Sequence, residues 1–350
     1  MSIAGLGPHG ERAVPPSLLK LSEEDTARAR EARFTIAVVL HTTTSDWAKQ
    51  QLAGLVATFG YCAAVVIEVV DCNFDTAVQI EALNRLVTER PDAIISIPIG
   101  NKAVAEAHLQ IQKAGIKLIL IDNAPTGLLP GQDYVTVVSA DNFGLGQLGA
   151  ELLAPHVRQG GTIGLLSYGV DFFATNQRDI AFRKWMEAKR PDLIVKQAKF
   201  PDVKSVVAVT ERFVESNPEL KGMFIVWDEP AMQAVEALRQ KSLFIPVTTI
   251  DLGNDVAVDL AGSGLIKGIG AQQPYTLGAS LANATVLSLL GRDLPSWIAL
   301  PGLAVTPKNV VETYQMVWHS PAPPKLIKAW RKSNHPDKSK HQEKTARGQN

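Results

Sequence analysis

The sequence FTIAVVLHTTTSDW, residues 34–47, contains an apolar run, a polar loop and then a tryptophan. Phe34 to Leu40 is the pattern expected of a strand that helices cover on both faces. The polar loop His41 to Asp46 follows, and Trp47 begins a helix that we expect to last to about Phe59. Strand, loop and helix in this order form the repeating unit of a parallel α/β sheet.

The same rhythm recurs in two series along the chain, residues 34–141 and 162–251. The expected strands of the first are Phe34–Leu40, Val65–Val70, Ala93–Ile97, Leu118–Asp122 and Val135–Ser139. Those of the second are Thr162–Leu166, Ile194–Ala198, Gly222–Val226 and Val247–Ile250, with Lys267–Ala271 as one more. Two similar series predict two similar α/β lobes. Open parallel sheets bind ligands beyond the carboxyl ends of their strands, so two facing sheets would form a cleft for a small polar molecule.

Composition agrees with two lobes and points to an uncharged ligand. A chain of 350 residues, 46% of them hydrophobic, is long enough for two separate cores. Its 35 basic residues balance its 35 acidic ones, so net charge favours neither nucleic acid nor an anionic membrane as partner. We therefore expect a neutral ligand, no binding of nucleic acid and no insertion into a membrane.

The two ends of the chain look different from its middle. Ser22, with Asp25 three residues later, predicts a capped short helix that ends near Arg33, within an N-terminal extension of residues 1–33. Residues 331–350 are polar without apolar periodicity, which predicts a disordered tail. No stretch is apolar enough for a membrane span or a secretory signal. If the protein is exported, its signal is absent from this sequence.

Cys62 and Cys72 are the two cysteines, and they flank a predicted strand. An extended strand of that length separates its ends by roughly 25 to 30 Å, too far for a disulfide. One pair gives no metal-ligand spacing, and the histidines lack it too. We expect no metal and no cofactor.

Several motifs together resemble the type I periplasmic substrate-binding proteins of sugar ABC transporters, the ribose-binding-like family. They begin with the strand and loop that lead to Trp47. The others are GIKLILIDNAP (115–125), VVSADNFGLGQLGAELL (137–153), NQRDIAF (176–182), VWDEPAMQAVEAL (226–238), TTIDLG (248–253) and GAQQPYTLG (270–278). The resemblance covers residues 34–317 and implies two doubly wound parallel-sheet lobes joined by a three-crossing hinge.

The resemblance also places the domain boundaries. Crossings near Ser139, Gln272 and Pro301 would give a first lobe of residues 34–139 and 273–301. The second lobe would comprise residues 140–272 and 302–330. Such a hinge lets the lobes close over a ligand and open again.

The first lobe supplies candidate ligand contacts from two strand ends. Trp47 matches the family position whose aromatic ring stacks on the sugar; the alternative is a tryptophan packed against its own lobe. His41, Thr42, Ser45 and Asp46 lie in the same loop. Residues of such loops are more often solvated than bound to ligand, and Asp46 is the best candidate among these four. Asp122 and Asn123 follow the strand Leu118–Ile121. Family members that bind pyranoses often have Asp-Arg here. Asn123 removes the planar set of donors that this arginine supplies, which argues against ribose or another ordinary pyranose as ligand.

The second lobe supplies the opposing wall. Arg178, in the first turn of an expected helix Asn176–Ala188, matches the family's ligand-binding arginine, and Phe172 precedes that helix. Trp227 stands where many ribose binders have asparagine, which predicts a smaller or less polar ligand. Asp251 and Gln272 match ligand positions by local motif. For Asp228 we favour capping of the next helix over ligand contact.

Together with these residues, the resemblance implies a carrier that captures a small neutral sugar or polyol and delivers it to a membrane permease. It also implies a periplasmic monomer that is not an enzyme. The sequence shows no glycine-rich phosphate loop after the first strand and no G-x-S-x-G motif. The alternative is an effector-binding or chemosensory sugar-binding module. A LacI-type regulator would need a helix-turn-helix of about 50 to 60 residues before the first strand, where only 33 precede Phe34.

Overall fold

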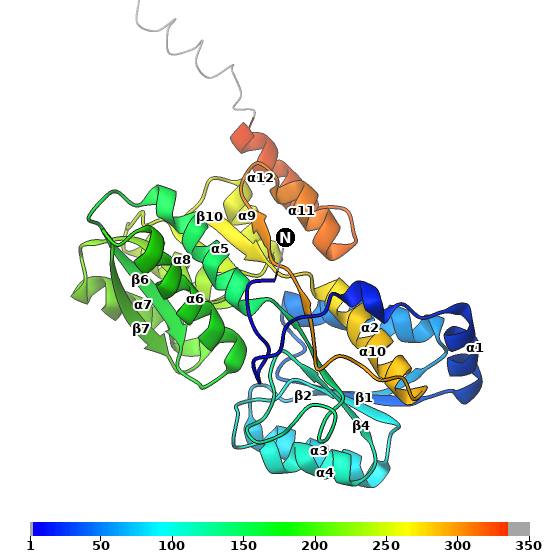
Figure 1. Cartoon of the computed structure of the whole chain (residues 1–350). Coiled ribbons are helices and arrows are strands. Elements are labelled where there is room, and N and C mark those ends of the chain that lie inside the picture. Colours follow the sequence, from blue (N-terminus) through cyan, green and yellow to red (C-terminus); the bar gives the residue numbers. More distant parts are fainter. Residues whose placement is uncertain (1–2, 335–350) are drawn as a thin grey trace, which may run out of the picture.

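Two six-stranded sheets form the centres of two lobes in the computed structural model, which describes residues 3–334 (Figure 1). Across the first sheet the strands are β11 (Trp297–Leu300), β5 (Thr136–Ala140), β4 (Lys117–Ile121), β3 (Ala93–Ser96), β1 (Thr35–Leu40) and β2 (Val65–Asp71). Across the second they are β12 (Leu303–Val305), β10 (Ile266–Ala271), β9 (Val247–Ile250), β8 (Leu220–Ile225), β6 (Thr162–Tyr168) and β7 (Ile194–Phe200). The orders are equivalent, and every pairing is parallel except that of β12 with β10. The predicted fold class is confirmed.

Alternating burial explains why β1 reads as one apolar run. Ile36, Val38 and Leu40 pack in one cluster with side chains of α2 (Asp46–Tyr61) and α10 (Pro274–Leu289). Ala37 and Val39 pack in another with α3 (Thr76–Glu89) and α4 (Ala105–Lys113). Because helices cover both faces, successive side chains of the strand are all buried.

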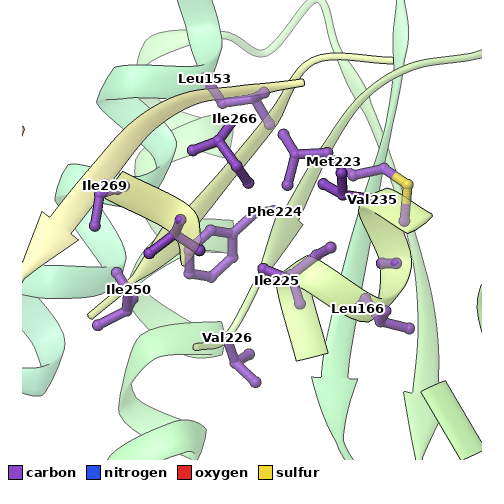
Figure 2. Close-up of a cluster of buried hydrophobic side chains, with 14 of the residues drawn as sticks. Leu153, Leu166, Met223, Phe224, Ile225, Val226, Val235, Ile250, Ile266 and Ile269 are labelled. Atoms are coloured by element: carbon purple, nitrogen blue, oxygen red, sulfur yellow. The ribbon is translucent and has the colours of Figure 1, made fainter. Parts of the chain in front are cut away.

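The second lobe has one continuous core, in which Phe224 of β8 is surrounded by apolar side chains such as Ile250 and Ile269 (Figure 2). Its helices are α5 (Asn142–Leu153), α6 (Phe173–Lys189), α7 (Val206–Ser216), α8 (Asp228–Gln240), α9 (Asn254–Ala261), α11 (Val310–Trp318) and α12 (Pro324–Asn334). Two short 3₁₀ helices, η2 (Ala154–His156) and η3 (Val203–Ser205), also belong to this lobe, whereas a third, η1 (Pro16–Leu19), packs on the first lobe.

The chain passes between the sheets three times. It leaves β5 for α5 at Asp141, leaves β10 for α10 at Gln272 and Gln273, and leaves β11 for β12 at Pro301 and Gly302. In Figure 1 the gold helix α10 accordingly lies with α2, although α2 comes more than two hundred residues earlier in the chain. Three such connections side by side form the hinge that the fold class requires.

Residues at both ends pack on this framework. The capping box of Ser22 and Asp25 is present at the start of α1 (Glu23–Ala32), as predicted. Ahead of it, Val14 pairs with Ile298 on the edge of the first sheet, and the dark blue segment in Figure 1 runs between the lobes. At the other end α12 continues to Asn334, so the prediction of disorder is wrong for residues 331–334. The rest of that predicted tail lies outside the described residues.

Candidate functional site

The loop after β1 brings a histidine between two aromatic side chains. The His41 ring lies 5.6 Å from the Trp47 ring and 4.8 Å from the Phe74 ring. Its position is fixed because the Phe74 amide donates to the His41 carbonyl, 2.7 Å away. Burial lowers the pKa of His41 to about 4, so its ring is neutral near pH 7. His41 Nδ1 is buried without a hydrogen-bond partner.

Other residues of this loop orient α2. Ser45 Oγ accepts from the Ala48 amide at 3.2 Å and caps the helix, while Thr42 Oγ1 lies 3.0 Å from Thr44 Oγ1. These bonds place Trp47 in the first turn of α2, where its indole packs against the first-lobe core. Trp47 Nε1 is also buried without a partner. A buried donor without a partner lowers the stability of the protein unless a ligand or a water molecule accepts a hydrogen bond from it.

Asp122 and Asn123 directly follow the strand β4, but their side chains have different partners. Asp122 is 4% exposed, and its Oδ1 accepts from the Ala140 amide at 3.3 Å. Burial raises the pKa of Asp122 to about 6, although nearby Arg178 opposes the shift. Asn123 instead donates to Asn101 Oδ1, 3.1 Å away, within the first lobe.

Arg178 is the buried cation of the second lobe, with 4% exposure. Its Nε donates to Asn142 Oδ1 at 3.0 Å and its Nη1 to the Val226 carbonyl at 2.8 Å. The helix α6 begins at Phe173, so Arg178 lies in the second turn and not in the first as predicted. Its position therefore follows from these bonds and from burial, not from the helix terminus.

Aromatic side chains cover the same lobe. The Trp227 ring contacts the rings of Tyr168 and Phe200, each with its centroid 5.3 Å away. Phe172 extends from the second lobe and packs against the core of the first. Asp228, next to Trp227, is the first residue of α8 and accepts only from the adjacent Glu229 amide, so it does not cap α8 as we had favoured.

Asp251 and Gln272 meet at the hinge. Gln272 Nε2 donates to Asp251 Oδ1 at 2.8 Å, and Asp251 Oδ2 lies 3.9 Å from Arg178 Nη1. Burial raises the pKa of Asp251, while Arg178 and Gln272 oppose the shift. Gln272 is 3% exposed, and its Oε1 has no partner.

These side chains surround one cleft between the lobes, with about 690 Å³ of empty space, its open mouth included. Ten of the twelve sequence-predicted residues line it: His41, Thr42, Ser45, Trp47, Asp122, Phe172, Arg178, Trp227, Asp251 and Gln272. Asp46 and Asn123 do not line it. Such a volume suits a small molecule, since ligand pockets span about 300 to 1,000 Å³.

Seven lining residues were not among the predicted contacts: Phe74, Ile97, Tyr168, Ala174, Thr175, Asp228 and Glu229. The sequence could have indicated Tyr168 as a lining residue, because it is an aromatic residue at the end of a strand. β6 ends at Tyr168, two residues later than the predicted end at Leu166. Phe74 has none, because it reaches the cleft through a turn in which Asn73 and Phe74 both have positive φ.

Direct contacts join the lobes beside the cleft. Asp46 Oδ2 accepts from Asn254 N at 2.8 Å and from Asn254 Nδ2 at 3.0 Å. Elsewhere Asn101 Nδ2 donates to Asp171 Oδ2 at 2.7 Å. The lobes are therefore closed on each other, and opening the cleft would break these bonds.

Within residues 3–334 no three His, Cys, Asp or Glu side chains are grouped so as to hold a metal ion. No helix of the described chain has the length and apolar character needed to cross a membrane.

Known proteins share this architecture. The family model described as "Periplasmic binding protein domain" matches residues 36–293. The ribose import binding protein RbsB of Bacillus subtilis is 24% identical over 234 residues, 67% of this chain and 74% of that protein.

Solved structures agree with the family match. A solute-binding protein of Agrobacterium vitis with bound α-D-tagatopyranose has a TM-score of 0.75 at 23% identity, covering 83% of this chain and 99% of that one. One from Mycobacterium smegmatis with bound glycerol has a TM-score of 0.72 at 18% identity, covering 79% and 95%. At these identities the likeness concerns the fold.

Fold and site together define a two-lobed binding protein with a cleft between its lobes at the hinge. The chain belongs to the periplasmic binding protein family, and its model match covers most of both lobes. Members of this family bind substrates without transforming them.

Proposed function

We propose that this protein captures a small sugar or polyol between its lobes and delivers it to the permease of an ABC transporter. The observation that carries the proposal is the convergence of Trp47 and Asp122 from one lobe with Arg178 and Asp251 from the other on a single cleft. Carboxylates accept hydrogen bonds from hydroxyl groups, and a guanidinium donates hydrogen bonds to hydroxyl oxygens. Aromatic faces cover the C–H groups of a sugar. The named relatives bind ribose, tagatose or glycerol and support the same class of ligand.

Aromatic side chains limit the size of the ligand. Trp47, Phe74, Tyr168, Phe172 and Trp227 all line the cleft. Their bulk favours a small polyol or a short sugar over a larger one. Asn123 does not line the cleft, so it supplies no donor in place of the arginine that related pyranose binders often have at this position.

Hinge closure is the mechanism. Interlobe bonds such as that of Asp46 with Asn254 form only when the lobes meet. A ligand that bonds to both lobes adds to these contacts and shifts the population towards the closed form. In this proposal the protein works in the periplasm as a monomer and catalyses no reaction.

A thermal-shift screen against sugars and polyols tests the proposal. A ligand at a hundredfold excess over its Kd stabilises the native state by about 2.7 kcal/mol, a measurable rise in Tm. We expect at least one compound to raise the Tm of the wild type and not of Arg178→Ala. If no sugar or polyol does so, the proposed function is wrong.

A further inference from the structure

A small side chamber adjoins the cleft on the side of α9. It shares Trp47, Asp228, Asp251 and Gln272 with the cleft, and Asp46 is among its other lining residues. It has about 240 Å³ of empty space, its opening to solvent included. The four shared residues therefore face both spaces, so a ligand in the cleft lies beside the chamber.

The chamber is rich in unused hydrogen-bond acceptors. Gln272 Oε1 is buried and unpaired. The other end of this amide, Nε2, is identified as the nitrogen because it donates to Asp251 Oδ1, so the unpaired atom is the oxygen acceptor. Gln50 Oε1, on another wall, is also buried and unpaired. Asp228 accepts only from the Glu229 amide, through Oδ1. Trp47 Nε1 is the one buried unpaired donor among the described lining residues.

Two carboxylates from opposite lobes come together at Gly253. A Cβ built on Gly253 would lie 2.2 Å from Asp228 Oδ2 and 3.2 Å from Asp46 Oδ2. Gly253 has an ordinary φ of −72°, so the glycine is required by space and not by backbone conformation. Closing the lobes thus brings two carboxyl groups together. Burial, with Asp251 and Asp46 nearby, raises the pKa of Asp228 well above its ordinary value.

We propose that this chamber binds a protonated amine, so that the ligand is a sugar or polyol in which one hydroxyl group is replaced by an ammonium group. An ammonium group has three donors and no acceptor, which suits a wall of carboxylates and amide oxygens. A hydroxyl group also needs a donor, and the chamber offers few. The inference rests on the proposed function and narrows its ligand class. The balanced charge of the whole chain, from which we expected a neutral ligand, does not describe this local surplus of carboxylates.

An ammonium group would also strengthen the closed form, which the bonds of Asp46 with Asn254 already hold. Asp46 reaches the chamber from α2 and Asp228 from α8, so only the closed form presents both carboxyl groups to one guest. A cation between them favours the ionised form of Asp228 and attracts both carboxylates. We favour an ammonium group over a free metal ion because the described residues contain no metal-binding group of three carboxylate, histidine or cysteine side chains.

Calorimetric titration with matched pairs tests the inference at about pH 7, where alkyl amines are protonated. The pairs are glycerol with 2-amino-1,3-propanediol, D-sorbitol with 1-amino-1-deoxy-D-sorbitol, and D-glucose with 2-amino-2-deoxy-D-glucose. We expect the amine to bind at least about tenfold more tightly than its hydroxyl partner in one or more pairs. Asp228→Asn should remove this preference, whereas Asp255→Asn, which deletes an exposed carboxylate two residues from Gly253, should keep it.

The outcomes separate this inference from the proposed function. If hydroxyl compounds bind as tightly as their amines, or if the preference survives Asp228→Asn, the inference is wrong while sugar or polyol binding stands. If no compound of the panel or of the thermal-shift screen binds, the proposed function itself fails. Stabilisation by potassium or calcium chloride that Asp228→Asn abolishes would also overturn the inference, because a free ion would then occupy the chamber.

Discussion

Asp122 and Asp251 occupy equivalent positions in the two lobes, each directly after the fourth strand of its series, and both line the cleft. Both have left-handed backbone conformations, with φ of 55° and 72°. Each amide donates to a carbonyl of the next strand, Val138 for Asp122 and Gly270 for Asp251. Aspartate and asparagine tolerate this conformation better than most residues. Asparagine is therefore the substitution that removes either charge with least strain.

The first prediction concerns pH and Asp122. Its pKa is raised from 3.8 to about 6, so the native state holds a proton that the unfolded state releases between about pH 4 and 6. The stability that this proton gives is present below about pH 4 and is lost as the pH rises through about 6. It amounts to about 3 kcal/mol in the ligand-free protein.

Asp122→Asn should therefore gain stability relative to the wild type as the pH rises, by up to that amount. Urea unfolding of both proteins from about pH 4 to 7.5 measures the difference. His41, whose pKa is lowered to about 4, titrates with the opposite sign but contributes equally to both proteins. Parallel stability curves would contradict the prediction.

Arg178→Ala should weaken ligand binding by about 2 to 4 kcal/mol, because it deletes charged hydrogen bonds in a buried site. It also leaves the Val226 carbonyl without the donor that Arg178 Nη1 supplies, so the Tm should fall as well. Calorimetry with a ligand from the screen measures the affinity. Arg183→Ala is the control, since Arg183 lies on the same helix but bonds to Gln197 at the surface. Equal affinity for both variants would exclude a role for Arg178 in binding.

Trp47→Phe keeps an aromatic face and removes the indole N–H, which is buried and unpaired. If that N–H bonds to the ligand, affinity should fall by about 1 kcal/mol. The ligand-free protein should lose little stability, because no protein acceptor is left unpaired. Titration and thermal unfolding of the same sample check both parts. Unchanged affinity would show that Trp47 contributes only its ring.

Asn254→Ala removes the side-chain bond to Asp46 across the closed lobes. We expect a severalfold faster release of ligand, since a bond of about 1 kcal/mol that holds the closed form is lost. Stopped-flow fluorescence measures the rate. Tyr314→Phe is the control, because it deletes the hydrogen bond between Tyr314 and Asn254 and leaves the interlobe bond in place. Equal rates for Asn254→Ala and the wild type would show that this bond does not hold the lobes.

The sequence predicts those features that local pattern determines. Strands such as β1 are buried on both faces and so appear as apolar runs, and residues directly after them lie at the mouth of the cleft. Asp122, Trp227 and Asp251 could be found in this way. Arg178 and Gln272 needed the family resemblance, because nothing in their immediate neighbours marks a ligand site.

What the sequence did not predict depends on contacts between distant segments. The position of Asn123 is set by its bond to Asn101 across a loop, which removes it from the cleft although it adjoins Asp122. The pairing of Val14 with Ile298 joins residues nearly three hundred positions apart. The side chamber is lined by Asp46 and Asp228, which come from opposite lobes and from segments far apart in the chain.

Calorimetric titration of the double variant Asp122→Asn, Asp251→Asn tests the central claim most directly, because it removes one cleft carboxylate from each lobe with little change of shape. The account predicts that the best sugar or polyol ligand binds the wild type with one site per chain. It predicts an affinity at least about a hundredfold lower for the double variant, which should still unfold cooperatively. Wild-type affinity in a folded double variant would contradict the claim that the two lobes bind their ligand in this cleft.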